Sequence, residues 1–540
     1  MPAVDNVIGV DGGLIAGGAS ADGAVRIFKG IPYAKPPVAE LRWRPPQPVE
    51  PWSGVRPATS FGPRCVQVPR PKTSLGYFPP EPESEDCLYL NVWARADAIR
   101  HPRPVMVWIH GGACNMGSGA LPLFDGEALA RKGVVLVTIN YRLGRLGFLA
   151  HPELTAESEH RASGNYGLMD QLAALQWVQR NIATFGGDPD RVTIFGQSTG
   201  SFSVSYFTAS PLTKGLFHRA IGESGSGFGP VDSTTGTSDA IQALADAEES
   251  GVALARRIGA TSMAELRGRC PYEIQMARIG DGFAPGQGYD RFSPLNGRGA
   301  FDNAYFVVDG YFIPDTVRSV FARGAQHDVP LMTGSNAHER GTTVRPPGTL
   351  QGYIEDARDQ YGDLAERFLD LYPATTDAES LEIGGYAIGD RIFTWQSWAW
   401  VNAHARRGRS PAFYYRFTRV PPTPSGAAFA ENPLNVPRSF HGAEIPYVFG
   451  SLGAREWPWE PIDHTLSDMM SSYWVNFART GDPNGGDLPR WPAFDPSAPA
   501  VMFFGNESGL GAVPNKDRLE FWDAFYARQP TSLAEHLARR

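Results

Sequence analysis

Long hydrophobic runs and an excess of positive charge are both missing from this 540-residue sequence. The longest apolar runs, such as Val105–Ile109 and Val134–Val137, are far shorter than the roughly 18–20 residues that a membrane-spanning helix requires. The 49 Lys and Arg residues are outnumbered by 57 Asp and Glu residues, which gives a formal net charge of −8. Because nucleic-acid phosphates bind basic faces, we expect no nucleic-acid partner and no transmembrane segment.

The N-terminal segment Met1–Ser20 also lacks Lys and Arg, and polar residues interrupt its apolar stretches. It therefore does not have the pattern of a secretory signal peptide. As written, the sequence predicts a cytoplasmic protein. If a signal peptide had been removed, the protein would instead be secreted or periplasmic. No feature of the sequence indicates an oligomeric state.

Cysteine is scarce, with four residues in the chain. That number excludes a small disulfide scaffold, and no paired Cys-x-x-Cys pattern indicates a metal site. Cys65 and Cys87 enclose the Pro-rich segment Val66–Asp86, which a disulfide could close with a gain of roughly 3 kcal/mol if formed. We expect Cys114 and Cys270 to be free thiols.

Hydrophobic residues make up 42% of the chain, which is enough for a large core. The runs Val105–Ile109, Val134–Asn140 and Val192–Phe195 are mainly apolar on both faces, as is typical of central strands covered by helices. Between the last two, helical spacing predicts a helix that Asn165 can cap. Its apolar positions are Leu168, Leu172, Leu175, Val178 and Ile182. Strand, helix and strand together indicate a βαβ unit.

This alternation continues to the end of the chain. We therefore predict one α/β domain over residues 1–540, with a mostly parallel central sheet, helices on both faces and large helical insertions. The insertions are expected around residues 66–86, 232–295 and 346–390. Further strands are expected at Val25–Phe28, Leu88–Trp93, Phe306–Val308, Val329–Thr333 and Phe413–Phe417, and closing helices at Met469–Ala478 and Arg518–Tyr526.

A Gly-x-Ser-x-Gly pentapeptide, Gly196–Gly200, follows the buried strand Val192–Phe195 directly and precedes a helix rich in small residues. The pattern alone is weak, but this strand–turn–helix context is what a nucleophile elbow needs. The two glycines remove side chains that would collide at the sharp turn, and the helix start favours developing negative charge. We predict Ser198 as a nucleophile. Ser224, in a similar segment without the final glycine, is expected to support the site.

The segment His110–Ala113 follows the end of another predicted strand. Its backbone N–H groups at Gly112 and Ala113, together with that of Thr199, can form an oxyanion hole. The alternative interpretation is a plain tight turn.

A serine nucleophile needs a general base and a carboxylate that orients the base, in the chain order Ser, acid, His for an α/β-hydrolase. His441 lies after the predicted strand Phe413–Phe417, and Glu339 follows Val329–Thr333. By position alone these are candidates, with His404 and Asp315 as competitors.

Several ordered motifs resemble those of the type-B carboxylesterase family, which includes cholinesterases, bacterial para-nitrobenzyl esterases and fungal lipases. The resemblance covers nearly the whole chain. It includes Phe28–Ala34, Glu85–Trp93, Asn140–Gly144 and Gly215–Ala220. It implies the α/β-hydrolase fold, Ser198 as nucleophile, Glu339 as acid, His441 as base, and Gly112, Ala113 and Thr199 as oxyanion donors. In exported members it also implies a Cys65–Cys87 disulfide.

The chain departs from the family pattern at three places. The family elbow is usually Gly-Glu-Ser-Ala-Gly, whereas Gln197 and Thr199 stand here. Gln197 replaces a charged side chain beside the nucleophile, so we expect it to contact the base without adding charge. Cys114 stands where an aromatic residue is usual. The segment Val66–Asp86 contains no Trp, unlike the corresponding cholinesterase loop, which argues against choline esters.

The sequence thus predicts a serine hydrolase that cleaves small-molecule carboxylic esters through an acyl-enzyme, with no metal and no organic cofactor. One alternative is a lipase with a lid at Val66–Asp86. Another is a non-catalytic, cholinesterase-like adhesion protein, but such chains lose triad residues, whereas this one keeps all three. Arg64, Arg70 and Lys72 could meet an anionic substrate, but we favour the interpretation that they are solvated surface charges.

Overall fold

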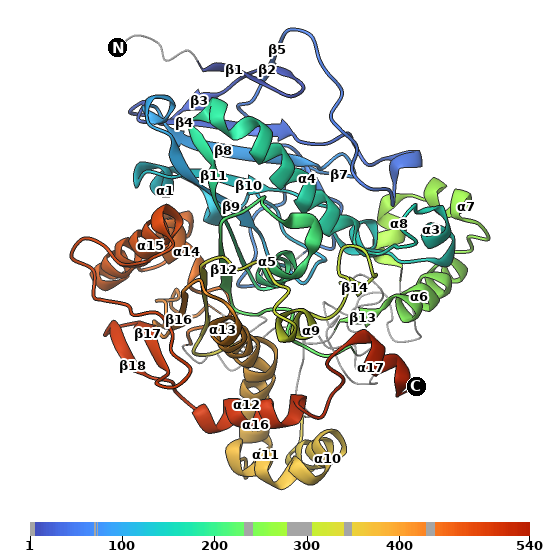
Figure 1. The fold of residues 1–540 in the computed structure, drawn as a ribbon, viewed down its shortest axis with the longest axis vertical. Coiled ribbons are helices and arrows are strands. Elements are labelled where there is room, and N and C mark those ends of the chain that lie inside the picture. Colours follow the sequence, from blue (N-terminus) through green and yellow to red (C-terminus); the bar gives the residue numbers. More distant parts are fainter. Residues whose placement is uncertain are drawn as a thin grey trace.

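An eleven-stranded sheet forms the centre of the protein (Figure 1). The computed structural model describes residues 6–69, 72, 74–231, 241–277, 305–339, 348–427 and 438–539. The strand order of the sheet is β18-β17-β16-β15-β12-β11-β9-β10-β8-β4-β3, and the seven strands from β17 to β10 run parallel. The prediction of a mostly parallel sheet is confirmed. The parallel strands are β9 (Arg103–Ile109), β10 (Val135–Ile139), β11 (Gly187–Gln197), β12 (Arg219–Glu223), β15 (Leu331–Asn336), β16 (Ala412–Phe417) and β17 (Ala500–Phe504).

Antiparallel strands extend this sheet at both edges. They are β3 (Gly18–Ala19), β4 (Val25–Pro32) and β8 (Tyr89–Arg95) at one edge and β18 (Gly509–Ala512) at the other. Strands β1 (Val7–Val10), β2 (Gly13–Ala16) and β5 (Val55–Pro57) form a separate small sheet, and β6 (Arg64–Cys65) pairs with β7 (Glu83–Ser84).

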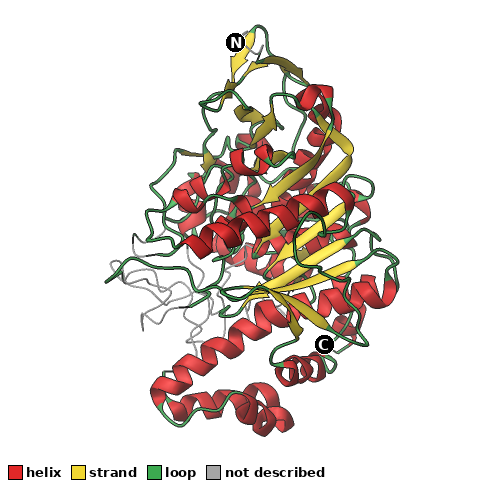
Figure 2. Ribbon diagram, turned by 90° about the vertical axis from the view of Figure 1, so that its left-hand side faces the viewer, coloured by secondary structure: helices red, strands yellow, loops and turns green. Residues whose placement is uncertain are grey.

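The central stretches of the parallel strands are largely apolar because both faces of the sheet are covered by helices (Figure 2). In β9, Val105, Val107 and Ile109 face one core while Met106 and Trp108 face the other. The first core packs against α4 (Tyr166–Asn181), α5 (Thr199–Ala209) and α13 (Trp395–Arg407). The second packs against α1 (Glu127–Arg131), α14 (Ile445–Phe449) and α15 (Pro461–Thr480). Helices on both faces are therefore confirmed.

Several local predictions need correction. Asn165 precedes α4, but its side chain makes no cap and instead donates to the Val307 carbonyl oxygen at 2.8 Å. The strand predicted at Phe306–Val308 is β14 (Val307–Val308), which pairs with β13 (Gln242–Ala243) outside the central sheet. No strand was expected around β13. The periodicity also missed β12, β17 and β18.

Helices account for most of the described part of two expected insertions. The first contains α6 (Leu244–Arg257), α7 (Met263–Gly268) and α8 (Pro271–Met276), and the second α10 (Leu350–Tyr361), α11 (Ala365–Leu371) and α12 (Asp377–Gly389). The latter group projects from the end of α13 (Figure 1). Residues 232–240, 278–295 and 346–347 of these insertions, and Arg70, lie outside the described residues.

The remaining helices are short or close the chain. They are α2 (Gly144–Phe148), α3 (Pro152–Glu157), α9 (Val317–Ala322), α16 (Lys516–Tyr526) and α17 (Leu533–Ala538). Within the described ranges, no helix is both long and apolar enough to cross a membrane.

A buried ion pair anchors the loop after β10. Both Nε and Nη2 of Arg142 donate to the Asp170 carboxylate at 2.7 Å, and the Arg142 backbone N–H donates to it at 3.0 Å. Both side chains are almost completely buried. These bonds fix the Asn140–Gly144 motif to α4.

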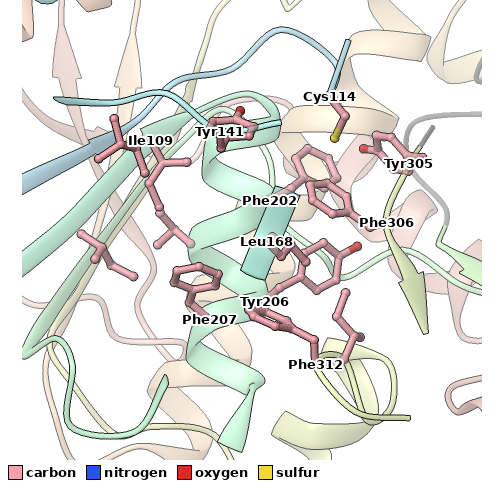
Figure 3. Close-up of a cluster of buried hydrophobic side chains, with 14 of the residues drawn as sticks. Ile109, Cys114, Tyr141, Leu168, Phe202, Tyr206, Phe207, Tyr305, Phe306 and Phe312 are labelled. Atoms are coloured by element: carbon pink, nitrogen blue, oxygen red, sulfur yellow. The ribbon is translucent and has the colours of Figure 1, made fainter. Parts of the chain in front are cut away.

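All four cysteines are free thiols in the structure. Cys65 and Cys87 are buried and adjacent, and a hydrogen bond to Cys65 together with burial raises the pKa of the Cys87 thiol. Both are thiols in this structure, and the candidate disulfide between them stays a prediction. Cys114 is buried in the cluster shown in Figure 3, which includes Phe202 and Tyr305, while Cys270 is exposed.

Candidate active site

Ser198 lies in a sharp turn between β11 and α5, as predicted for a nucleophile elbow. Its backbone has φ 57° and ψ −128°, a strained conformation for a residue with a side chain. A Cβ atom on Gly196 would lie 2.6 Å from the carbonyl oxygen of Ile109, and one on Gly200 would collide with the same oxygen. Both glycines are therefore required sterically. The Ser198 N–H donates to the Glu223 carbonyl oxygen at 2.9 Å, which ties the elbow to β12.

The turn after β9 packs against this elbow. A Cβ atom on Gly111 would lie 2.9 Å from Cβ of Ser198. Gly112 and Ala113 both have positive φ, at 122° and 55°. The Gly112 carbonyl oxygen accepts from the backbone N–H groups of Asn115 and Met116 at 3.0 and 3.1 Å. Strands β9 and β11 are adjacent while the chain visits β10 on the far side of β9, so the turn lies at a topological switch point, where α/β folds bind ligands.

Three backbone amides of the turn and the elbow, those of Gly112, Ala113 and Thr199, have no recorded hydrogen-bond acceptor within the described residues. The Thr199 hydroxyl oxygen accepts from the Cys114 N–H at 3.4 Å and so connects the elbow helix to the turn. Free N–H donors beside a serine nucleophile are what an oxyanion hole requires.

Glu339 and His441, which are 102 positions apart in the sequence, meet in direct contact. Oε2 of Glu339 lies 2.6 Å from Nδ1 of His441. The other carboxylate oxygen of Glu339 accepts from the Ser224 hydroxyl and from the Asn336 N–H, both at 2.6 Å. Glu339 is 1% exposed and His441 21% exposed. The Phe393 ring stacks on the imidazole with centroids 4.1 Å apart.

Gln197 brings the histidine against the elbow. Its side-chain nitrogen lies 3.2 Å from Nε2 and 3.4 Å from Nδ1 of His441, and the side chain is buried. Since Gln197 immediately precedes Ser198, the imidazole lies beside the predicted nucleophile. Ser224 contacts Glu339 directly, so both side chains expected to support the site are part of the same cluster.

The competing candidates have other partners. His404 lies on α13, where its Nε2 is 3.2 Å from the Ser410 carbonyl oxygen. Asp315 accepts from the Ser319 hydroxyl at 2.6 Å and pairs with Arg323. Arg64, considered as an anion-binding group, forms an ion pair with Glu83 at 2.7 Å instead, whereas Lys72 is exposed.

Two buried carboxyl groups near the site were not identified from the sequence. Glu444 accepts from the side-chain amide of Asn336 and, at 3.5 Å, from Ser224, and burial followed by the charge of Glu339 raises its pKa to about 7. Glu223 accepts from Nε1 of Trp474 at 2.8 Å, and burial raises its pKa well above the usual range. In the sequence, Glu223 immediately precedes Ser224, and Glu444 lies three positions after His441. These positions next to predicted site residues could have drawn attention to both glutamates.

Comparisons with known proteins identify the family of the chain. The model of the "Carboxylesterase family" matches residues 4–522. The chain belongs to the carboxylesterase family. A fumonisin B1 esterase of Sphingopyxis macrogoltabida is 38% identical over 512 residues, which cover 92% of this chain and 87% of that protein. The para-nitrobenzyl esterase of Bacillus subtilis (strain 168) is 35% identical, with 92% and 95% covered.

Solved structures match equally broadly. A PNB esterase structure superposes with a TM-score of 0.78 at 31% identity, covering 96% of this chain and 99% of that one. This member of the carboxylesterase family thus has the α/β-hydrolase fold, as predicted, and the resemblance to type-B carboxylesterases is confirmed. It is a carboxylic ester hydrolase.

Proposed function

We propose that this enzyme cleaves small-molecule carboxylic esters through an acyl-enzyme on Ser198, with His441 as general base, Glu339 as its orienting acid, and no metal or organic cofactor. The whole chain acts as one domain that carries this site. The observation that supports the proposal best is the 2.6 Å contact of Glu339 with Nδ1 of His441, because it directs the opposite ring nitrogen, Nε2, toward the elbow.

Acylation begins when Ser198 Oγ attacks the ester carbonyl carbon while Nε2 of His441 takes the hydroxyl proton. A C–O bond forms, and the carbonyl electron pair moves onto oxygen. The imidazolium donates from Nδ1 to the Glu339 carboxylate, which stays ionised and stabilises the positive charge. Two hydrogen bonds to the other Glu339 oxygen, from Ser224 and Asn336, hold the carboxylate in position.

The N–H groups of Gly112, Ala113 and Thr199 donate to the tetrahedral oxyanion. Such donors act strongly because the turn holds them in place before the reaction, and loss of one typically costs about 10²–10³-fold in kcat. When the intermediate collapses, His441 protonates the leaving alcohol. Water then repeats the sequence on the acyl-enzyme, which releases the carboxylic acid and restores the Ser198 hydroxyl.

The test is hydrolysis of a panel of aryl, short-acyl, long-acyl and diacid esters, followed by mass spectrometry of the quenched enzyme. Because relatives include a para-nitrobenzyl esterase, a para-nitrobenzyl ester belongs in the panel. We expect turnover of at least one class and an acyl adduct on the peptide that contains Ser198. Turnover without an adduct at Ser198 in rapidly quenched samples, and with an adduct elsewhere, would contradict the proposal. A strong preference for long acyl chains would indicate a lipase.

A further inference from the structure

The buried carboxyl group of Glu223 belongs to a row of paired residues that runs across four neighbouring strands of the central sheet. Gln197, Glu223, Gly334 and Tyr415 are direct neighbours on β11, β12, β15 and β16. Two residues earlier on each strand, the same face carries an apolar row that packs into the core under α15: Phe195, Ile221, Met332 and Phe413. Glu223 therefore lies at the upper edge of a hydrophobic core, and its side chain is completely buried.

Few groups around Glu223 could stabilise a negative charge on its carboxyl group. One carboxyl oxygen accepts from the uncharged indole of Trp474, and the other, Oε2, is buried with no hydrogen-bond partner. Among the ion pairs and hydrogen bonds of the described residues, none joins a Lys or Arg to Glu223, Glu444 or Glu339. A lone carboxylate in such surroundings is far more costly to bury than a carboxylic acid.

Glu444 is the second carboxyl group of this cluster, and it is linked to the catalytic pair. Asn336 donates its side-chain N–H to Glu444 and its backbone N–H to Glu339. Ser224 donates to Glu339 at 2.6 Å and lies 3.5 Å from Glu444. Glu444 is thus linked through Asn336 to the carboxylate that contacts the imidazole.

The titratable groups that face the pair are Glu339 from the β15 side, His441 and Tyr415. The groups contributed by β11 and α15, Gln197 and Trp474, carry no charge. The Tyr415 hydroxyl is also buried without a hydrogen-bond partner.

We propose that Glu223 remains a neutral carboxylic acid while Glu444 titrates, so that Glu444 alone adjusts the negative charge behind Glu339 and His441. The proposal deepens the triad assignment and rests on it for its effect on catalysis. The pKa of Glu444, raised to about 7 by burial and by Glu339, places its ionisation in the neutral range. Burial, and then the charge of Glu444, keeps the pKa of Glu223 well above the usual value.

The sign of the effect on catalysis follows from Coulomb attraction. Ionised Glu444 stabilises the His441 imidazolium, and the base must be neutral to accept the Ser198 proton. Glu444 ionisation therefore holds the acidic limb of kcat/KM at higher pH. Replacing Glu444 by neutral glutamine moves the limb to lower pH, by a few tenths to about one unit. Replacing neutral Glu223 by glutamine removes no charge, so the limb stays where it is.

Two isosteric variants test the proposal, Glu223→Gln and Glu444→Gln, with the exposed Glu127→Gln on α1 as a control. The acidic limb of kcat/KM is measured on one neutral ester. In parallel, infrared spectra between pH 5 and 9 follow the carbonyl band of protonated carboxyl groups. We expect a band that persists across this range and is absent from Glu223→Gln. A second band should disappear near neutral pH in wild type and be missing from Glu444→Gln.

An acidic limb that moves equally in both variants, or a Glu223 band that titrates with ordinary carboxylates, would overturn the proposal. Stability gives an arm that is independent of activity. Because a raised pKa makes a buried carboxyl lose stability as pH rises above its unfolded value, the Tm of Glu223→Gln should gain on wild type with increasing pH. A pH-independent difference in Tm would contradict a neutral Glu223. Since the spectra and Tm need no turnover, failure of the triad assignment would leave these two results intact.

Discussion

The side-chain nitrogen of Gln197 lies 3.2 Å from Nε2 of His441. The residue before the proposed nucleophile therefore faces the ring nitrogen that must accept the Ser198 proton. As an amide, Gln197 can hydrogen-bond this nitrogen without adding charge, whereas a glutamate in the same buried position would stabilise the imidazolium.

Gln197→Glu should therefore move the acidic limb of kcat/KM to higher pH, so that wild type keeps its activity to lower pH than the variant does. The measurement is a pH–rate profile of both proteins on one neutral ester. Gln197→Met is the matched uncharged control, and its limb should remain near that of wild type. Coincident limbs for wild type and Gln197→Glu, or a displacement toward lower pH, would show that residue 197 does not tune the base.

Ser198→Ala should reduce ester turnover to a residual rate of roughly 10³–10⁴ above the reaction in water, which the oxyanion donors and binding alone can sustain. An organophosphate should label Ser198 covalently in wild type and leave the variant unlabelled. Ser224 and Ser118 are the controls for site assignment, since Ser224 donates to Glu339 and Ser118 donates to Glu81 at 2.6 Å. Labelling at either of them would mean that the nucleophile is wrongly assigned.

Glu339→Gln should cause a large loss of kcat while the thermal midpoint changes little, because an amide is a poor partner for the Nδ1–H of His441. Asp315→Asn is the matched control, since Asp315 bonds to Ser319 and Arg323 instead. Steady-state kinetics and thermal unfolding of both variants decide the matter. A large kcat loss in Asp315→Asn with an unimpaired Glu339→Gln would identify the wrong carboxylate.

Asp170→Ala should destabilise the fold by about 3–5 kcal/mol, because it leaves the buried guanidinium of Arg142 without its counter-charge. Denaturant unfolding of wild type and variant measures this difference. The matched control is Asp22→Ala, which removes the exposed partner of Arg131 and should leave stability almost unchanged. Equal effects in the two variants would mean that burial does not govern the strength of the Arg142–Asp170 pair.

Much of this protein could be predicted from its sequence because the relevant signals are local. Continuous apolar runs predicted β9, β10 and β11, since a strand covered on both faces has no polar alternation. The elbow at Ser198 and the turn at Gly112 were predictable for the same reason: their glycines are required by backbone geometry within a few residues.

Other features were decided only when distant segments packed together. Periodicity missed β12 because its apolar stretch is short and is bounded by Arg219 and Glu223. Pairing with β11 and β15 nevertheless makes it a central strand. Asn165 has the residue type of a helix cap, but Val307 competes for its side chain.

The candidate site shows the same division. Residue positions left His404 and Asp315 open beside His441 and Glu339, and only the resemblance to a family chose between them. In the structure, Glu339 and His441 are in contact although they are 102 positions apart in the sequence. Burial raises the pKa of Glu223 and of Glu444. A sequence pattern reports what a residue requires of its immediate neighbours. Contact and desolvation depend on which remote segments surround it, and only the tertiary structure determines those.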